Sequence, residues 1–190
     1  MSEMKPPSSN VQPKRFYGKY RGTVIDNLDP MQMGRIMAQV PDVLGEMPSS
    51  WAMPCVPAAG IQAGCFIVPP MGSQVWMEFE QGNPDYPIWT GGFWGTAADA
   101  PALATVPPPA IPPLLGQNIV LQTTGQNTLL ISDAVPTPAT GGIILKSAGG
   151  AMLVVNDTGI YISAGPGLAS IWLTGPLVAI NETALTITGP

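Results

Sequence analysis

The chain has 190 residues, enough for one ordinary domain or two small ones, and 45% of them are hydrophobic. Only 10% are charged, whereas glycine and proline together account for 45 residues, a composition that disfavours long helices and favours short strands joined by turns. The net charge of −5 disfavours binding to nucleic acid, and the absence of histidine excludes Ser-His-Asp triads and imidazole-ligated metal sites.

Two further observations concern the cellular compartment. Cys55 and Cys65 are too few for a disulfide framework, and a single bridge between them stays open. The first 19 residues contain charges and prolines where a signal peptide needs an apolar core, and no stretch of eighteen apolar residues follows. We therefore expect synthesis in the cytoplasm without a signal peptide.

Charge divides the chain into two halves. Residues 1–95 hold 14 of the 19 charged side chains, and a stretch rich in proline and alanine follows them. Proline disfavours helix interiors and central strands, which is typical of a semi-rigid linker. The expected organisation is a flexible arm at 1–15, a first domain at 16–95, a Pro/Ala-rich linker at 96–116 and a second domain at 117–190.

Five strands are predicted in the first half, because polar residues alternate there with apolar or β-branched ones between turn residues. They cover residues 16–25, 34–40, 64–68, 74–80 and 86–93. The clearest is QVWMEFE, which places Val75, Met77 and Phe79 on one face. A turn cluster, NLDP at 27–30, predicts a hairpin between the first two strands. These strands predict a closed five-stranded barrel of the OB type, because closing the sheet removes its exposed edges.

The first half also carries a specific set of motifs. They are RGTV (21–24), DPMQMGRI (29–36), VPD (40–42), SWA (50–52) and PPMGSQVWMEFEQGNPDYPIWTGGFW (69–94). In this order they resemble the OB domain of contractile-tail central spikes, the family of phage baseplate assembly protein V and of VgrG-type spikes. The resemblance implies an OB-fold barrel over residues 16–95.

The second half repeats a short apolar run separated by Gly, Asn, Asp, Ser or Thr turns. The eight runs are NIVLQ (118), TLLIS (128), GIILKS (142), AMLVV (151), GIYIS (159), ASIWLT (169), PLVAI (176) and TALTIT (183), numbered by their first residue. Stacked short strands with almost no charge predict a β-helix or prism. One such chain leaves edges and apolar faces uncovered, so three chains around one axis are expected. The segment resembles the intertwined trimeric blade of the same spike family, and the predicted fold class is all-β.

Several side chains could serve either a function or the barrel architecture alone. Trp51, Trp76, Trp89 and Trp94 suggest stacking platforms for bases or sugars, but basic residues are few. Glu78 and Glu80, on one predicted strand face, suggest a glycosidase pair on spacing alone. We expect no catalytic residue, cofactor or metal site, and no binding to nucleic acid.

The resemblance implies a structural spike at the baseplate centre of a contractile injection apparatus, which pierces the target envelope and touches the membrane transiently. Its expected partners are two further copies of the chain, other baseplate components, a separate hub or tube adaptor on the barrel side, and a PAAR-type tip protein. The expected hub contact comprises Lys14, Arg15, Lys19 and Arg21. The expected tip-docking residues are Leu185, Thr186, Ile187 and Thr188.

Other interpretations explain less of the sequence. An OB-fold binding module for carbohydrate or single-stranded nucleic acid leaves the repeat unexplained. A β-helix polysaccharide lyase needs basic residues, and Lys146 is the only one in the second half. Some family members insert a lysozyme domain after the barrel, carry a long N-terminal hub portion or bind iron at the apex through histidine. In this sequence a linker follows the expected barrel, about fifteen residues precede the first strand and histidine is absent. We therefore expect no murein hydrolysis, a hub supplied by a separate protein, and no iron held by this chain. A phage tail, a type VI device and an extracellular injection system all stay open; the blade segment QTTGQNTLLISD (122–133) most resembles the last.

Overall fold

The computed structural model describes residues 14–105, 118–133, 141–181 and 184–188. The chain divides into two compact units, Met1–Gly95 and Thr96–Pro190. Most of the predicted N-terminal arm lies outside the described residues, as does the predicted linker from residue 106 onward. The described start of that linker forms two short helical turns, η2 (Ala97–Asp99) and α2 (Ala102–Thr105).

The first unit is built on a five-stranded sheet in the order β2-β1-β6-β7-β3. Its strands are β1 (Tyr20–Asp26), β2 (Met37–Gln39), β3 (Met53–Pro54), β6 (Gln74–Phe79) and β7 (Pro87–Phe93). All neighbours are antiparallel except β3 and β7, which are parallel. The smaller elements are α1 (Pro41–Leu44), η1 (Glu80–Gly82) and a two-stranded sheet of β4 (Ala59–Gly60) and β5 (Ala63–Gly64).

A short bridge closes this sheet into a barrel. Ile36, beside the β2 edge, and Ala52, beside the β3 edge, exchange two backbone hydrogen bonds with N···O distances of 3.2 and 2.7 Å. Closure pairs the two edges that an open sheet would expose. The side chains that alternate inward from the strands and their flanks then form one core, which consists of Val24, Ile36, Ala38, Val40, Ala52, Val75, Met77, Phe79 and Trp89.

Four of the five strands predicted in this unit are confirmed, and the inward side of β6 is the predicted one. The strand predicted at 64–68 is wrong, and the fifth position is taken by β3. The apolar run at 64–68 begins at a turn in which Gln62 and Gly64 have positive φ, and it ends before two prolines that lack a backbone N–H. The run therefore does not join the sheet, and its apolar side chains line a cavity.

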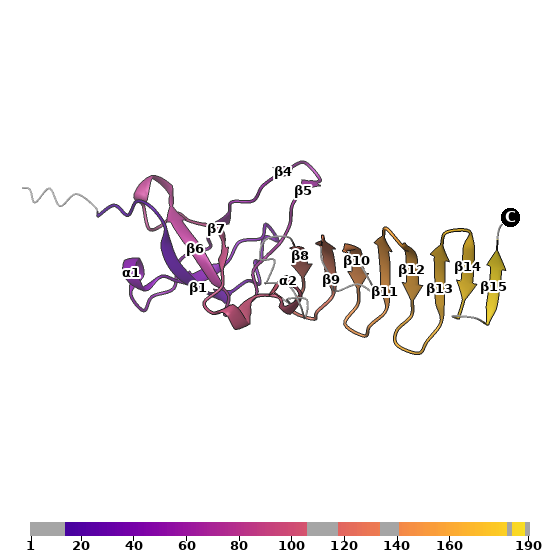
Figure 1. Cartoon of the computed structure of the whole chain (residues 1–190). Helices are drawn as coiled ribbons and strands as arrows, with labels where there is room; N and C mark the ends of the chain where they lie inside the picture. Colours follow the sequence, from indigo (N-terminus) through magenta and orange to yellow (C-terminus); the bar gives the residue numbers. More distant parts are fainter. Residues whose placement is uncertain (1–13, 106–117, 134–140, 182–183, 189–190) are drawn as a thin grey trace, which may run out of the picture. The chain divides into compact units, whose positions relative to one another are not determined.

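The second unit is an antiparallel meander whose strands lie side by side in chain order (Figure 1). Its eight strands are β8 (Asn118–Gln122), β9 (Thr128–Ser132), β10 (Gly142–Lys146), β11 (Met152–Asn156), β12 (Gly159–Ser163), β13 (Ser170–Thr174), β14 (Leu177–Ile180) and β15 (Leu185–Thr188). Each of the eight predicted apolar runs forms one of these strands, which confirms the repeat and the all-β fold class.

Two strands of the meander begin with a glycine that no other residue replaces without strain. Gly142 has φ +148° and Gly159 has φ +155°, both in a region that L-residues rarely adopt. A Cβ at Gly159 would overlap the carbonyl oxygen of Leu173 on the neighbouring strand, and one at Gly142 would overlap that of Val155. Glycine therefore permits the close approach of adjacent strands at these starts.

Candidate functional site

One face of the second unit is aliphatic from the first strand to the last. The register places two rows of side chains on this face, and all sixteen members are Ile, Leu or Val. We call it the aliphatic face; its rows are Ile119, Ile131, Ile143, Val155, Ile160, Leu173, Val178, Ile187 and Leu121, Leu129, Leu145, Leu153, Ile162, Ile171, Ile180, Leu185. Twelve of the sixteen are between 38% and 63% exposed in the single chain. Such a continuous apolar surface marks an interface.

The opposite face has a different composition. Its central row passes from aliphatic residues in β8–β11 to the ring pair of Tyr161 and Trp172, whose centroids are 6.1 Å apart, and ends at Thr186. Leu130, Ile144 and Val154 are buried there in a small core of their own. Polar residues flank this row, and Ser132 donates a hydrogen bond to Asn118 at 2.5 Å. The two faces therefore differ in composition, and among the described residues it is the aliphatic face that stays largely uncovered.

The predicted tip-docking residues form β15, which pairs with β14 on one side and is the edge strand of the sheet. Leu185 and Ile187 belong to the aliphatic face, whereas Thr186 points to the opposite face, and all three are exposed. The side chain of Thr188 lies outside the described residues. Edge strands offer backbone N–H and C=O groups to an added strand.

The predicted hub-contact residues lie on and before β1. Lys19 pairs with Glu78 at 2.7 Å and donates to the hydroxyl of Thr90 at 2.8 Å. Arg21 lies over the rings of Trp76 and Phe93, 5.7 and 5.2 Å from their centroids. These cations belong to the outer surface of the barrel, since the alternate residues of β1 face the core.

The other two predicted contact residues precede the strand. Lys14 lies 4.9 Å from the ring centroid of Phe16, and Arg15 donates a long hydrogen bond of 3.5 Å to the carbonyl oxygen of Gln81. All four cations therefore occupy the stretch from residue 14 to β1, and each has a contact within the barrel unit.

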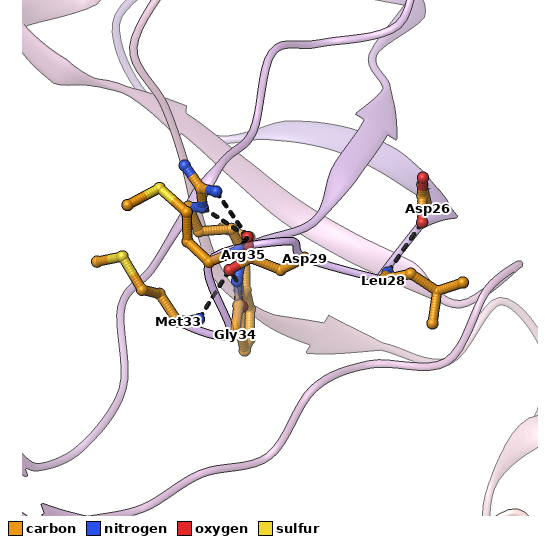
Figure 2. Close-up of polar contacts among 8 residues, drawn as sticks. Asp26, Leu28, Asp29, Met33, Gly34 and Arg35 are labelled. Carbon is orange, nitrogen blue, oxygen red and sulfur yellow. Dashed lines mark hydrogen bonds and ion pairs between the residues drawn. The ribbon is translucent and has the colours of Figure 1, made fainter.

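A compact polar cluster holds the loop between β1 and β2 (Figure 2). Asp29 accepts hydrogen bonds from the Nε and Nη2 atoms of Arg35 at 3.1 and 2.6 Å, and from the backbone N–H of Met33 at 2.8 Å. The guanidinium carbon of Arg35 lies 5.5 Å from the ring centroid of Trp51. The motif DPMQMGRI is thus explained by loop architecture, because its carboxylate and guanidinium close one turn.

This cluster predicts an acid-sensitive contribution to stability. The Arg35 guanidinium, aided by backbone N–H donors, holds the pKa of Asp29 well below its usual range. A lowered folded-state pKa stabilises the fold above the unfolded value of about 3.9, and this contribution is lost as the pH falls below it. We expect Asp29→Asn to lower the thermal midpoint of the barrel unit by several degrees at pH 7, with a smaller difference at pH 3, measured by calorimetry. The exposed Asp42→Asn is the control, and equal effects of the two would contradict the prediction.

The side chains considered for chemistry occupy different settings in the barrel unit. β6 ends at Phe79, so Glu80 begins the η1 turn and does not share a strand face with Glu78 as predicted. Trp89 is buried and donates its indole N–H to the carbonyl oxygen of Gly34 at 3.1 Å, whereas Trp94 is exposed.

The cysteines, the acidic side chains and the helices complete the description of the candidate sites. Cys55 and Cys65 are free thiols in the structure. In the described ranges, no three acidic or cysteine side chains gather as a metal ion requires. No helix among the described residues is long and apolar enough to cross a membrane.

Comparison with protein families agrees with both units. Residues 20–94 match the type VI secretion system/phage-baseplate injector OB domain, and residues 118–186 match the phage baseplate V C-terminal trimerisation domain. A comparison with curated proteins finds no match. The two domains define the class, a structural and trimeric baseplate component of an injection machine. Within that class, the chain belongs to the contractile-tail central spike family of phage baseplate V and VgrG-type proteins.

Proposed function

We propose that the chain is the central spike that pierces the target envelope when the sheath of a contractile injection apparatus contracts. The observation that carries the proposal is the aliphatic face, which is uninterrupted over eight strands. Three copies packed with this face toward a common axis bury all sixteen side chains of its two rows, at about 1 kcal/mol for each half-exposed residue. The product is a stiff body with few charges, as passage through a membrane requires.

Electron cryomicroscopy of the assembled particle tests this function. Before contraction, we expect threefold density for the second unit on the particle axis, at the centre of the baseplate. After contraction on target envelopes, the same density should lie beyond the membrane. Retention of the chain on the near side of the envelope in contracted particles would contradict piercing, and an off-axis position would contradict the spike assignment altogether.

The edge strand β15 supports a second part of the proposal, in which the spike carries a PAAR-type tip protein. Three copies of β15 present Leu185, Thr186, Ile187 and Thr188 at one end of the trimer, with unpaired backbone groups for strand addition. A chain truncated after Asn181 should lose binding to the tip protein in a pull-down while its native mass remains that of a trimer. Equal binding by the truncated and full-length trimers would move the tip contact elsewhere.

The four cations near β1 support a hub contact on the barrel side. Arg21 combines a guanidinium with two aromatic rings, and such groups are frequent among interface hot spots. We expect Arg21→Ala to weaken binding to the hub protein at least tenfold, measured by calorimetric titration. Lys146→Ala, which removes the cation of the second unit, is the matched control and should bind like the unmodified chain.

The proposed function requires no catalysis. Glu78 is held by Lys19, and Glu80 lies in a turn at the surface. Replacement of either glutamate by alanine should leave injection by the assembled particle intact. A glycosidase turnover that disappears on either replacement, in a folded trimer, would refute this part of the proposal.

A further inference from the structure

An uncharged arm projects from the barrel unit between β3 and β6. The chain carries no charged residue from Met47 to Met77, although this half holds most of the charges. The arm, residues 55–68, contains the β4–β5 hairpin, and Ile61 at its turn is 98% exposed. Phe66 and Ile67 on its returning side are 71% and 58% exposed. A surface this apolar, in a protein of low charge, indicates a contact with another macromolecule.

The arm and the barrel line an apolar cavity of about 600 Å³ that opens to solvent. Its walls include Met33, Met53, Val56, Phe66, Ile67 and Trp89, and no charged residue lines it. Small-molecule sites combine an apolar wall with a few polar groups that orient the ligand. Here the polar side chains are limited to Gln32, Gln62 and the thiol of Cys65. The composition therefore favours an apolar side chain of a protein over a polar metabolite.

We propose that in the trimer the turn of one arm, with Ile61 at its tip, inserts into the arm cavity of the next copy. Every chain carries both halves of this contact, and a head-to-tail contact repeated by a threefold rotation closes into a ring of three. Flexible methionine side chains at Met33 and Met53 line the cavity, and they adapt readily to an inserted residue. The proposal rests on the homotrimer and does not depend on the piercing function.

The covalent tether makes a second copy the favoured occupant. The chain between Gly95 and Asn118 spans at most about 80 Å even when fully extended, so the trimerisation domain confines three arms and three cavities to one small volume. Tethering of this kind raises the effective concentration to the millimolar range. A separate partner protein would have to compete with two resident copies of a complementary apolar tip.

Disulfide cross-linking in the full-length trimer tests the ring. In a Cys55→Ser, Cys65→Ser background, the Ile61→Cys, Met33→Cys double variant should form covalent dimers and trimers under mild oxidation, resolved on a denaturing gel. Each single variant should give less than a tenth of that yield. The control pair Ile61→Cys, Met47→Cys uses an exposed methionine that does not line the cavity, and it should also give less than a tenth.

The native mass of each variant, measured on the same samples, establishes that the trimer is present. A cross-link confined to single chains would show that the arm closes on its own barrel and would overturn the proposal. Absence of cross-linking in an intact trimer, or equal yields for the Met33 and Met47 pairs, would overturn it as well. Each of these results leaves the trimerisation face and the piercing function untouched.

Discussion

Replacing Leu153 with aspartate is expected to abolish the trimer. Leu153 lies on β11 in the middle of one row of the aliphatic face, opposite Leu145 and Ile162 on the adjacent strands. Threefold packing would bring three copies of the new carboxylate together in an apolar environment. A buried charge without a partner costs several kcal/mol, and three like charges repel one another in addition. Burying an uncharged amide costs less free energy than burying a carboxylate. A fraction of the Leu153→Asn chain should therefore remain trimeric.

Analytical ultracentrifugation at micromolar concentration measures the outcome. We expect the Leu153→Asp chain to sediment as a monomer or as an aggregate, whereas the unmodified chain sediments as a trimer. Ala148→Asp places the same charge in the exposed turn between β10 and β11 and serves as the control. A trimer of unchanged thermal stability for Leu153→Asp would show that the aliphatic face is not at the trimer axis.

When the two units are produced as separate chains, we expect both to fold and only the second to form a trimer. A chain that ends at Gly95 should be monomeric, because its barrel closes on itself through the Ile36–Ala52 bridge and buries its own core. A chain covering residues 117–190 should remain trimeric, because the aliphatic face lies wholly within it. The native mass should therefore be that of a monomer for the first chain and that of a trimer for the second.

The same two chains give a second measurement. The 117–190 trimer should resist denaturing detergent and unfold at a higher temperature than the barrel chain. A trimeric barrel combined with a monomeric second unit would place the assembly interface in the first half of the chain. The arm ring is compatible with a monomeric barrel chain, because that contact depends on the tether.

Much of the fold follows from sequence patterns that reflect simple geometry. Alternation at 74–80 predicted the inward side of β6, because strand side chains alternate with period two. The repeat in the second half predicted all eight strands, since each apolar run is bounded by turn residues. The meander order was not predictable from the runs alone, because equal strands pair equally well in several orders.

The errors have specific physical causes. Residues 64–68 are apolar and β-branched in part, but the preceding left-handed turn and the following prolines remove them from the sheet. β3 was missed because a two-residue strand shows no periodicity. The arm could have been found from one signal, the absence of charge from Met47 to Met77. Its cavity was beyond sequence reasoning, because Met33 and Trp89 reach it from distant parts of the chain.

The connectivity of the second unit makes its length adjustable in discrete steps. Each strand pairs only with its neighbours in the chain, so a hairpin can be inserted or removed without altering any other pairing. Two strands change the length of the sheet by about 9.5 Å and preserve the direction of every following strand. They also add or remove four residues of the aliphatic face, so a longer sheet is stabilised in proportion. Gene duplication of one hairpin is thus a sufficient route to a longer sheet with the same pairing.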